Sequence, residues 1–150
     1  MSKIKLNWVA VLVAAIVSFL FEALWFSVFM KEWLAGIGRT KEWLESSAGY
    51  NPALQYGTAI LCSIIIAAVL SICIQASGKQ TAQRGVLCAA VIWFGFIATS
   101  WAKEYIFEVR TVQIFAINTG YALIDLMIIG AIVGAWKKKP EPPARKLSED

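Results

Sequence analysis

Apolar residues along this chain fall into four long runs, separated by shorter polar segments. The runs extend over residues 7–30, 52–76, 85–107 and 112–136. A helix of about 20 residues crosses the ~30 Å hydrocarbon core of a bilayer, because each residue adds ~1.5 Å. The pattern therefore predicts an all-α membrane protein: four transmembrane helices in an antiparallel bundle of two hairpins, forming one domain over residues 1–136.

The polar segments predict how the helices are connected. In residues 31–51, charged side chains alternate with tryptophans, a pattern typical of the headgroup layer. We expect an interfacial loop here with one short helix, capped by Thr40. The link between the third and fourth runs is only a few residues long, so these helices should be antiparallel neighbours. Residues 137–150 are basic and rich in proline, which predicts a disordered tail.

Composition supports the membrane class and argues against several kinds of chemistry. The chain of 150 residues is 59% hydrophobic and 16% charged, well outside the usual range of soluble proteins. It has no histidine, and Cys62, Cys73 and Cys88 are isolated within apolar runs. These features predict no disulfide, metal site or other cofactor. Because no nucleophile motif or phosphate loop accompanies the acids, we expect no enzymatic activity.

The distribution of basic residues predicts the topology. Nine Lys and Arg residues lie on the side that holds both termini, against four on the other side, or five with Lys103. By the positive-inside rule both termini should be cytoplasmic. Five tryptophans are expected to be interface anchors: Trp8 and Trp136 on the inner side, and Trp33, Trp43 and Trp101 on the outer side. The basic tail should attract anionic lipid, and we expect no nucleic-acid partner.

Polar residues inside the apolar runs are the candidate functional groups. A charged side chain at membrane depth costs ~2.5–3.5 kcal/mol on insertion scales, so it usually faces the bundle interior. Helical spacing places several such residues on shared faces. The predicted polar intramembrane seam consists of Ser18, Glu22, Thr99, Lys103, Asn118, Tyr121 and Asp125.

Two interpretations of this seam stay open. In the first, it only joins helices: Asp125 and Tyr121 satisfy each other, and Glu22 bonds Thr99 or Ser100 or pairs with Lys103. In the second, it forms a polar pocket or pathway.

Small residues at helical spacing predict close helix packing. Gly130-x-x-x-Gly134 lets two backbones approach each other, and Ala67 and Ser71 supply the same spacing in the second run. The contact could lie within one bundle or between two protomers.

Several spaced segments carry a resemblance to a known family. They are residues 7–15, 23–27, 107–111, 118–121 and 130–136. On these segments the chain resembles the bacterial membrane family catalogued as domain of unknown function 1761. The resemblance implies a four-helix protein of the bacterial inner membrane and brings no activity, substrate or catalytic residue.

Together these observations favour a homo-oligomer whose polar seam serves transport or binding of a small polar solute or ion. The alternative is a structural or regulatory membrane subunit that acts through helix packing with a partner protein or lipid.

Overall fold

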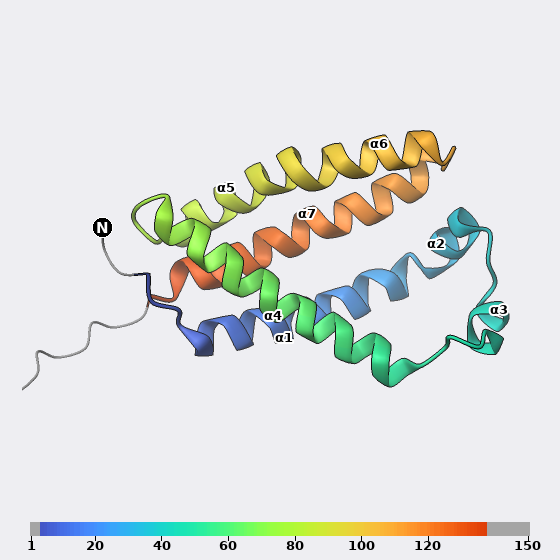
Figure 1. Cartoon of the computed structure of the whole chain (residues 1–150), viewed down its shortest axis with the longest axis horizontal. Coiled ribbons are helices and arrows are strands. Elements are labelled where there is room, and N and C mark those ends of the chain that lie inside the picture. The colour runs from blue at the N-terminus through green and yellow to red at the C-terminus, as the bar shows by residue number, and fades with distance from the viewer. Residues whose placement is uncertain (1–3, 138–150) are drawn as a thin grey trace, which may run out of the picture.

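The computed structural model describes residues 4–137, and within them the fold is all-α with no strand. Four spans are long and apolar enough to cross a membrane. The first, second and fourth are α1 (Trp8–Val28), α4 (Pro52–Ala76) and α7 (Val112–Ala135). The third runs through α5 (Ala82–Ile92), the π-helix η1 (Trp93–Ala98) and α6 (Thr99–Phe107) (Figure 1). The prediction of an all-α membrane protein with four spans is confirmed.

Each span begins directly after a capping side chain. An oxygen of the capping residue accepts a hydrogen bond from the backbone amide three residues on, which satisfies one of the free N–H groups of the first turn. The four capping residues are Asn7, Asn51, Thr81 and Thr111. Because Thr81 caps the third span, that helix begins at Ala82 and not at Gly85, where the apolar run begins.

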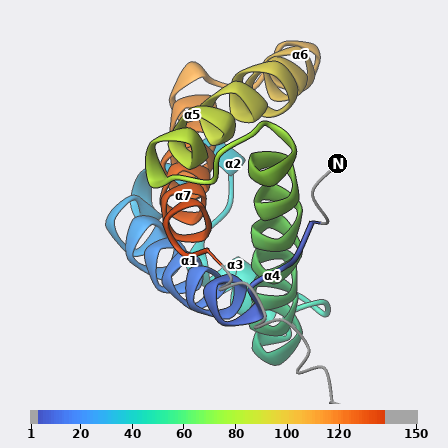
Figure 2. The ribbon, with the colours of Figure 1, turned by 90° about the vertical axis from the view of Figure 1, so that its left-hand side faces the viewer.

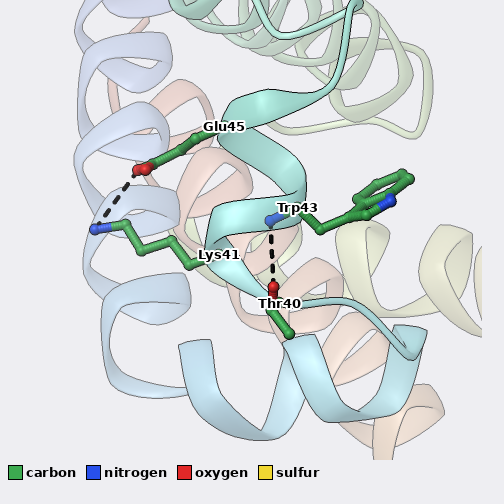
Figure 3. Close-up of polar contacts among 4 residues, drawn as sticks. All are labelled: Thr40, Lys41, Trp43 and Glu45. Carbon is green, nitrogen blue, oxygen red and sulfur yellow. Dashed lines mark hydrogen bonds and ion pairs between the residues drawn. The ribbon is translucent and has the colours of Figure 1, made fainter.

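The connection between α1 and α4 contains two short helices, α2 (Met30–Ile37) and α3 (Lys41–Ser46), where the sequence predicted one. Gly38 separates them: its φ of 67° is a left-handed conformation that ends α2 and suits glycine. The predicted cap of the following helix is confirmed, because Thr40 Oγ1 accepts a hydrogen bond of 3.2 Å from the Trp43 backbone amide (Figure 3). An ion pair of 3.7 Å joins Lys41 Nζ to Glu45 Oε1 in the next turn.

Helix α7 is the centre of the bundle. It packs against α1, α4 and α5, and Figure 2 shows it between α1 and α5 with α4 alongside. The apolar core lies in the half of the spans that is nearer to Trp8 and Ala135. Its fully buried members include Val11, Ala14, Ala67, Leu70, Ile74, Ile129 and Val133.

Glycines form the contact between α5 and α7. A Cβ atom placed on Gly85 would lie 1.8 Å from the carbonyl oxygen of Gly130, and one on Gly134 would lie 2.5 Å from that of Thr81. The Gly130-x-x-x-Gly134 pair therefore packs within one chain, and its partner is α5. Ala67 and Ser71 of α4 are also buried, with exposed fractions of 0% and 2%.

The two described ends of the chain lie at the same end of the bundle, which we call the terminal end, and hydrogen bonds join them there. Asn7 Nδ2 donates to the carbonyl oxygen of Trp136 at 3.3 Å. Gln80 Nε2, in the turn between α4 and α5, donates to that of Val133 at 2.6 Å. The opposite end, the loop end, holds α2, α3 and the turn between α6 and α7 (Figure 1). The disordered tail was predicted over residues 137–150, and all of it after Lys137 lies outside the described residues.

Candidate functional site

Five polar side chains from three spans meet in the middle of the bundle, and we call them the polar cluster. They are Ser18 and Glu22 of α1, Ser63 of α4, and Tyr121 and Asp125 of α7. The hydroxyl groups of Ser18 and Ser63 are hydrogen-bonded at 3.1 Å. The side chain of Ser18 also interacts with those of Tyr121 and Asp125, and Tyr121 interacts with Glu22. The spacing of four residues within α1 and within α7 places both members of each pair on the shared face.

Asp125 is the buried member that lacks a complete set of partners. Its exposed fraction is 5%, and its Oδ1 atom has no hydrogen-bond partner. Within residues 4–137 it is the one buried side-chain oxygen or nitrogen in this condition. Such an atom costs about 1–3 kcal/mol of stability, so a ligand that reaches it would gain a strong interaction.

The polar cluster forms one wall of a cavity of about 630 Å³. Four of its members line the cavity: Glu22, Ser63, Tyr121 and Asp125. The first four turns of α4, from Leu54 to Ile66, form a second wall, and Ile97 and Trp101 of the third span form the facing wall. The first turns of α4 lie well apart from α6 in both ribbon views (Figures 1 and 2). The cavity therefore occupies the space between these two helices in the half nearer to the loop end.

A second, smaller cavity of about 310 Å³ lies between α1 and α4. Phe19, Phe26 and Tyr56 line it, and it shares Glu22 and Gln55 with the first cavity. The carboxyl group of Glu22 is thus accessible from both, whereas Asp125 lines the larger one alone.

The apolar core closes the path from the polar cluster to the terminal end. In each of α4 and α7, buried apolar residues lie between the polar cluster and the terminal end. They are Leu70 and Ile74 of α4 and Ile129 and Val133 of α7, all between 0% and 2% exposed. Protein interiors packed in this way leave few voids as large as a water molecule. The cavity therefore lies on the loop-end side of the apolar core, and the core closes the other side.

Aromatic contacts hold the Tyr121 ring in place. It stacks on Phe21 with ring centroids 5.9 Å apart, and it contacts Phe26 at 5.3 Å. Trp25 Nε1 donates to the carbonyl oxygen of Ile117 at 3.2 Å and ties α1 to α7 one turn away. These contacts fix the direction in which the Tyr121 hydroxyl points, because a stacked ring has few rotamers open to it.

The structure brings together four residues of the predicted seam and places three elsewhere. Ser18, Glu22, Tyr121 and Asp125 belong to the polar cluster. Asn118 Nδ2 instead donates to the hydroxyl of Tyr105 at 2.5 Å, between α7 and α6.

The third span turns a different face to the cavity than the sequence predicted. Thr99 and Lys103 share one face, but both are exposed, and Thr99 Oγ1 donates to the carbonyl oxygen of Gly95 at 2.8 Å. Ile97 and Trp101, two residues earlier in each case, face the cavity. An offset of two residues is about half a helical turn, so it selects roughly the opposite face. Among residues 4–137 no ion pair joins Lys103 to Glu22.

Sequence reasoning missed Gln55 and Thr58, two polar residues of α4 that line the cavity. Gln55, Thr58 and Cys62 lie at i, i+3 and i+7, and Ser63 is adjacent to this stripe. That spacing marks one face of a helix, so the signal was present in the sequence.

The predicted interface tryptophans lie at the two ends of the bundle. Trp8 and Trp136 are 57% and 45% exposed at the terminal end, and Trp43 is 46% exposed at the loop end. Trp33 packs against Phe26 at 5.8 Å, and Trp101 stacks on Tyr105 at 6.4 Å. Their role as membrane anchors stays a prediction.

In the described part of the chain, no three His, Cys, Asp or Glu side chains come together in a group that could hold a metal ion.

A comparison with family models finds one described as "Protein of unknown function (DUF1761)", which matches residues 9–134. No curated protein and no solved structure matches the chain.

Proposed function

The chain belongs to the DUF1761 family, whose description assigns no activity, and we propose from the geometry that its cavity binds a small polar solute or ion at the polar cluster for transport across the membrane. The single observation that carries this proposal is that Asp125, an acid with one carboxyl oxygen left without a hydrogen-bond partner, lines the cavity. An intramembrane acid that faces a cavity and is not fully paired is a typical binding group for a passing solute.

A cavity on one side of a packed core favours transport over simple storage. The polar cluster lies near the middle of the spans, where many transporters hold their substrates. The cavity extends from the cluster toward the loop end, while the packed core closes the terminal end. One state of a transporter that opens alternately to the two sides would have this arrangement.

We propose that the functional unit is a homo-oligomer within the lipid bilayer. Four helices enclose little space, and the cavity between α4 and α6 lacks a complete outer wall. The third span supplies one edge of this opening, and only 11% of its most apolar stretch is buried, the lowest share of the four spans. A second protomer placed here would complete the wall.

The chain is a multi-pass membrane protein, and we propose the bacterial inner membrane with both termini cytoplasmic. The described ends of the chain are joined through Asn7 and Trp136, and basic residues are concentrated in the adjoining sequence. The proposal includes a contact between the basic tail and anionic lipid, and it includes no nucleic-acid partner and no catalytic step.

The rival function is structural or regulatory, with helix packing against a partner protein or lipid as its basis. The buried hydrogen bond between Ser18 and Ser63 favours it, because such bonds join helices within membranes.

Ligand-induced stabilisation tests the proposal. Purified protein in detergent would be heated with sodium, potassium, magnesium or methylammonium chloride, or with glycine. A solute that binds the folded protein alone raises the unfolding temperature in a saturable manner. We expect this for at least one probe, with the effect lost in Asp125→Asn and reduced in Glu22→Gln. Glu104→Gln, an exposed acid outside the cavity, is the control.

The outcomes separate the two functions. A stabilising probe that also enters liposomes containing the wild type, but not those containing Asp125→Asn, supports transport. If no probe stabilises the wild type, and Asp125→Asn changes only the oligomeric state or the unfolding temperature, the proposal is wrong and the packing role is favoured.

A further inference from the structure

The charges around the cavity have one sign. Glu22 and Asp125 line it, and no Lys or Arg does so among the described residues. Lys103 is exposed, and the other described basic residues lie in the connections and at the ends of the spans. A low-dielectric site that contains acids without basic partners favours a cation and repels an anion.

The size and the walls of the cavity do not suit a bare metal ion. Hard cations such as Mg²⁺ and Ca²⁺ require about six or more oxygen ligands at short distances. No metal-binding group of acids is present in residues 4–137. The volume of about 630 Å³ lies instead within the range of ~300–1,000 Å³ that is usual for pockets of organic ligands.

Most of the wall is apolar or aromatic. Leu54, Ile66, Ile97 and Leu126 line the cavity, and Trp101 faces the same space from α6. An apolar ligand body would bury its surface against these side chains, and an aromatic ring attracts an organic cation at its face. The acids are concentrated on one wall, so charge and apolar surface are separated within the site.

The opening between α4 and α6 lies within the membrane-spanning part of the chain. Its α4 edge carries exposed apolar residues that line the cavity, Leu54 at 65% and Ile66 at 37%. An apolar ligand body would bury further surface against this edge.

From these observations we infer that the cavity takes a lipophilic cation, an organic ammonium or phosphonium compound with an apolar body. Its positive charge lies beside the Asp125 and Glu22 carboxyl groups, and its apolar body lies between α4 and the Ile97–Trp101 wall. The inference rests on the proposed function, because it names the class of solute for that site.

A pair of probes with one shape and opposite charge tests the inference. Tetraphenylphosphonium and tetraphenylborate differ in the sign of their charge and match in their apolar surface. Binding to the purified full-length protein would be measured by equilibrium dialysis in detergent, with protein-free detergent as the blank. Benzyltrimethylammonium is the smaller cation for comparison.

We expect saturable binding of at least one of the two cations and none of tetraphenylborate. Asp125→Asn should weaken cation binding by roughly tenfold or more, the factor that corresponds to ~1.4 kcal/mol. Glu22→Gln should weaken it less, because this carboxyl group is more exposed, and Glu104→Gln should leave it unchanged. Trp101→Leu keeps the wall apolar but removes the aromatic face. This variant should therefore lose more binding affinity for benzyltrimethylammonium than for an uncharged apolar dye.

Two results would overturn the inference. One is equal binding of the phosphonium and the borate, and the other is cation binding that survives both Asp125→Asn and Glu22→Gln. If neither organic cation binds while an inorganic salt or glycine still stabilises the wild type through Asp125, the inference alone is wrong. If no probe in either experiment acts through Asp125, the proposed function is wrong as well.

Discussion

Gly85 and Gly130 place the backbones of α5 and α7 in direct contact, and this contact leads to a prediction at the scale of single residues. In Gly85→Ala the new Cβ atom would meet the backbone of Gly130, which cannot move away as a side chain could. Overpacking of this kind costs about 1–3 kcal/mol. We therefore expect Gly85→Ala to lower the unfolding temperature in detergent. Gly57→Ala is the matched control, because no atom lies within 4 Å of its added Cβ.

Equal unfolding temperatures for Gly85→Ala and Gly57→Ala would contradict the close approach of the two helices. Gly130→Ala gives a second measurement from the other side of the contact, because its Cβ would lie 2.4 Å from the carbonyl oxygen of Gly85.

The residues of the polar cluster were largely predictable from their helical spacing and from the free-energy cost of exposing an acid to lipid. Glu22 and Asp125 are acids inside apolar runs, and their partners Ser18 and Tyr121 lie four residues before them. Acids at membrane depth almost always face the interior of the bundle, so these two acids indicate which faces of α1 and α7 are turned inward. Thr99 lacked this constraint, because a threonine hydroxyl can bond the carbonyl oxygen of its own helix, as it does with Gly95.

At the scale of the element, the stability of helix α3 should depend on pH, because the Glu42 carboxylate is hydrogen-bonded in its first turn. The Glu42 carboxylate accepts hydrogen bonds from the Glu42 backbone amide and from the Thr40 hydroxyl. These bonds hold the pKa of Glu42 below its ordinary value of 4.5. A lowered folded-state pKa contributes stability above the unfolded value and loses it as pH falls through the folded one. We expect α3 amides to be better protected from hydrogen exchange at pH 7 than at pH 3, after correction for intrinsic rates.

Glu42→Gln should remove most of this difference, because the amide side chain does not titrate. If wild type and variant lose the same protection between the two pH values, the Glu42 carboxylate is not the cause.

The boundaries of the helices depend more on capping residues than on where an apolar run begins or ends. Thr40 was predicted as a helix cap and is one. The apolar run alone did not reveal that α1 ends at Val28 and that α2 follows at once, because both sides of this break are apolar. The π-helix η1 was also invisible, since a wider turn changes no residue type. One of its residues, Ile97, lines the cavity, and Trp101 of α6 follows one turn later.

The bundle as a whole was predictable because the bilayer allows few alternatives. Buried backbone groups must be satisfied internally, so four apolar runs of this length become four helices. The cavity was not predictable, because it depends on how far α4 diverges from α6. In the other half of α4, Ala67, Leu70 and Ile74 pack in the apolar core.

The orientation of the whole molecule is the final prediction. The sequence assigns nine basic residues to the predicted cytoplasmic side, and hydrogen bonds of Asn7 and Gln80 join the described segments at that end of the bundle. By the positive-inside rule, green fluorescent protein fused at either terminus should fluoresce in a bacterial host, since it folds in the cytoplasm. Alkaline phosphatase inserted at Gly49, in the exposed segment after α3, should be active, since it matures outside the cytoplasm. Fluorescence at only one terminus would contradict an even number of crossings, and an active phosphatase at both termini would invert the orientation and place the cavity opening on the cytoplasmic side.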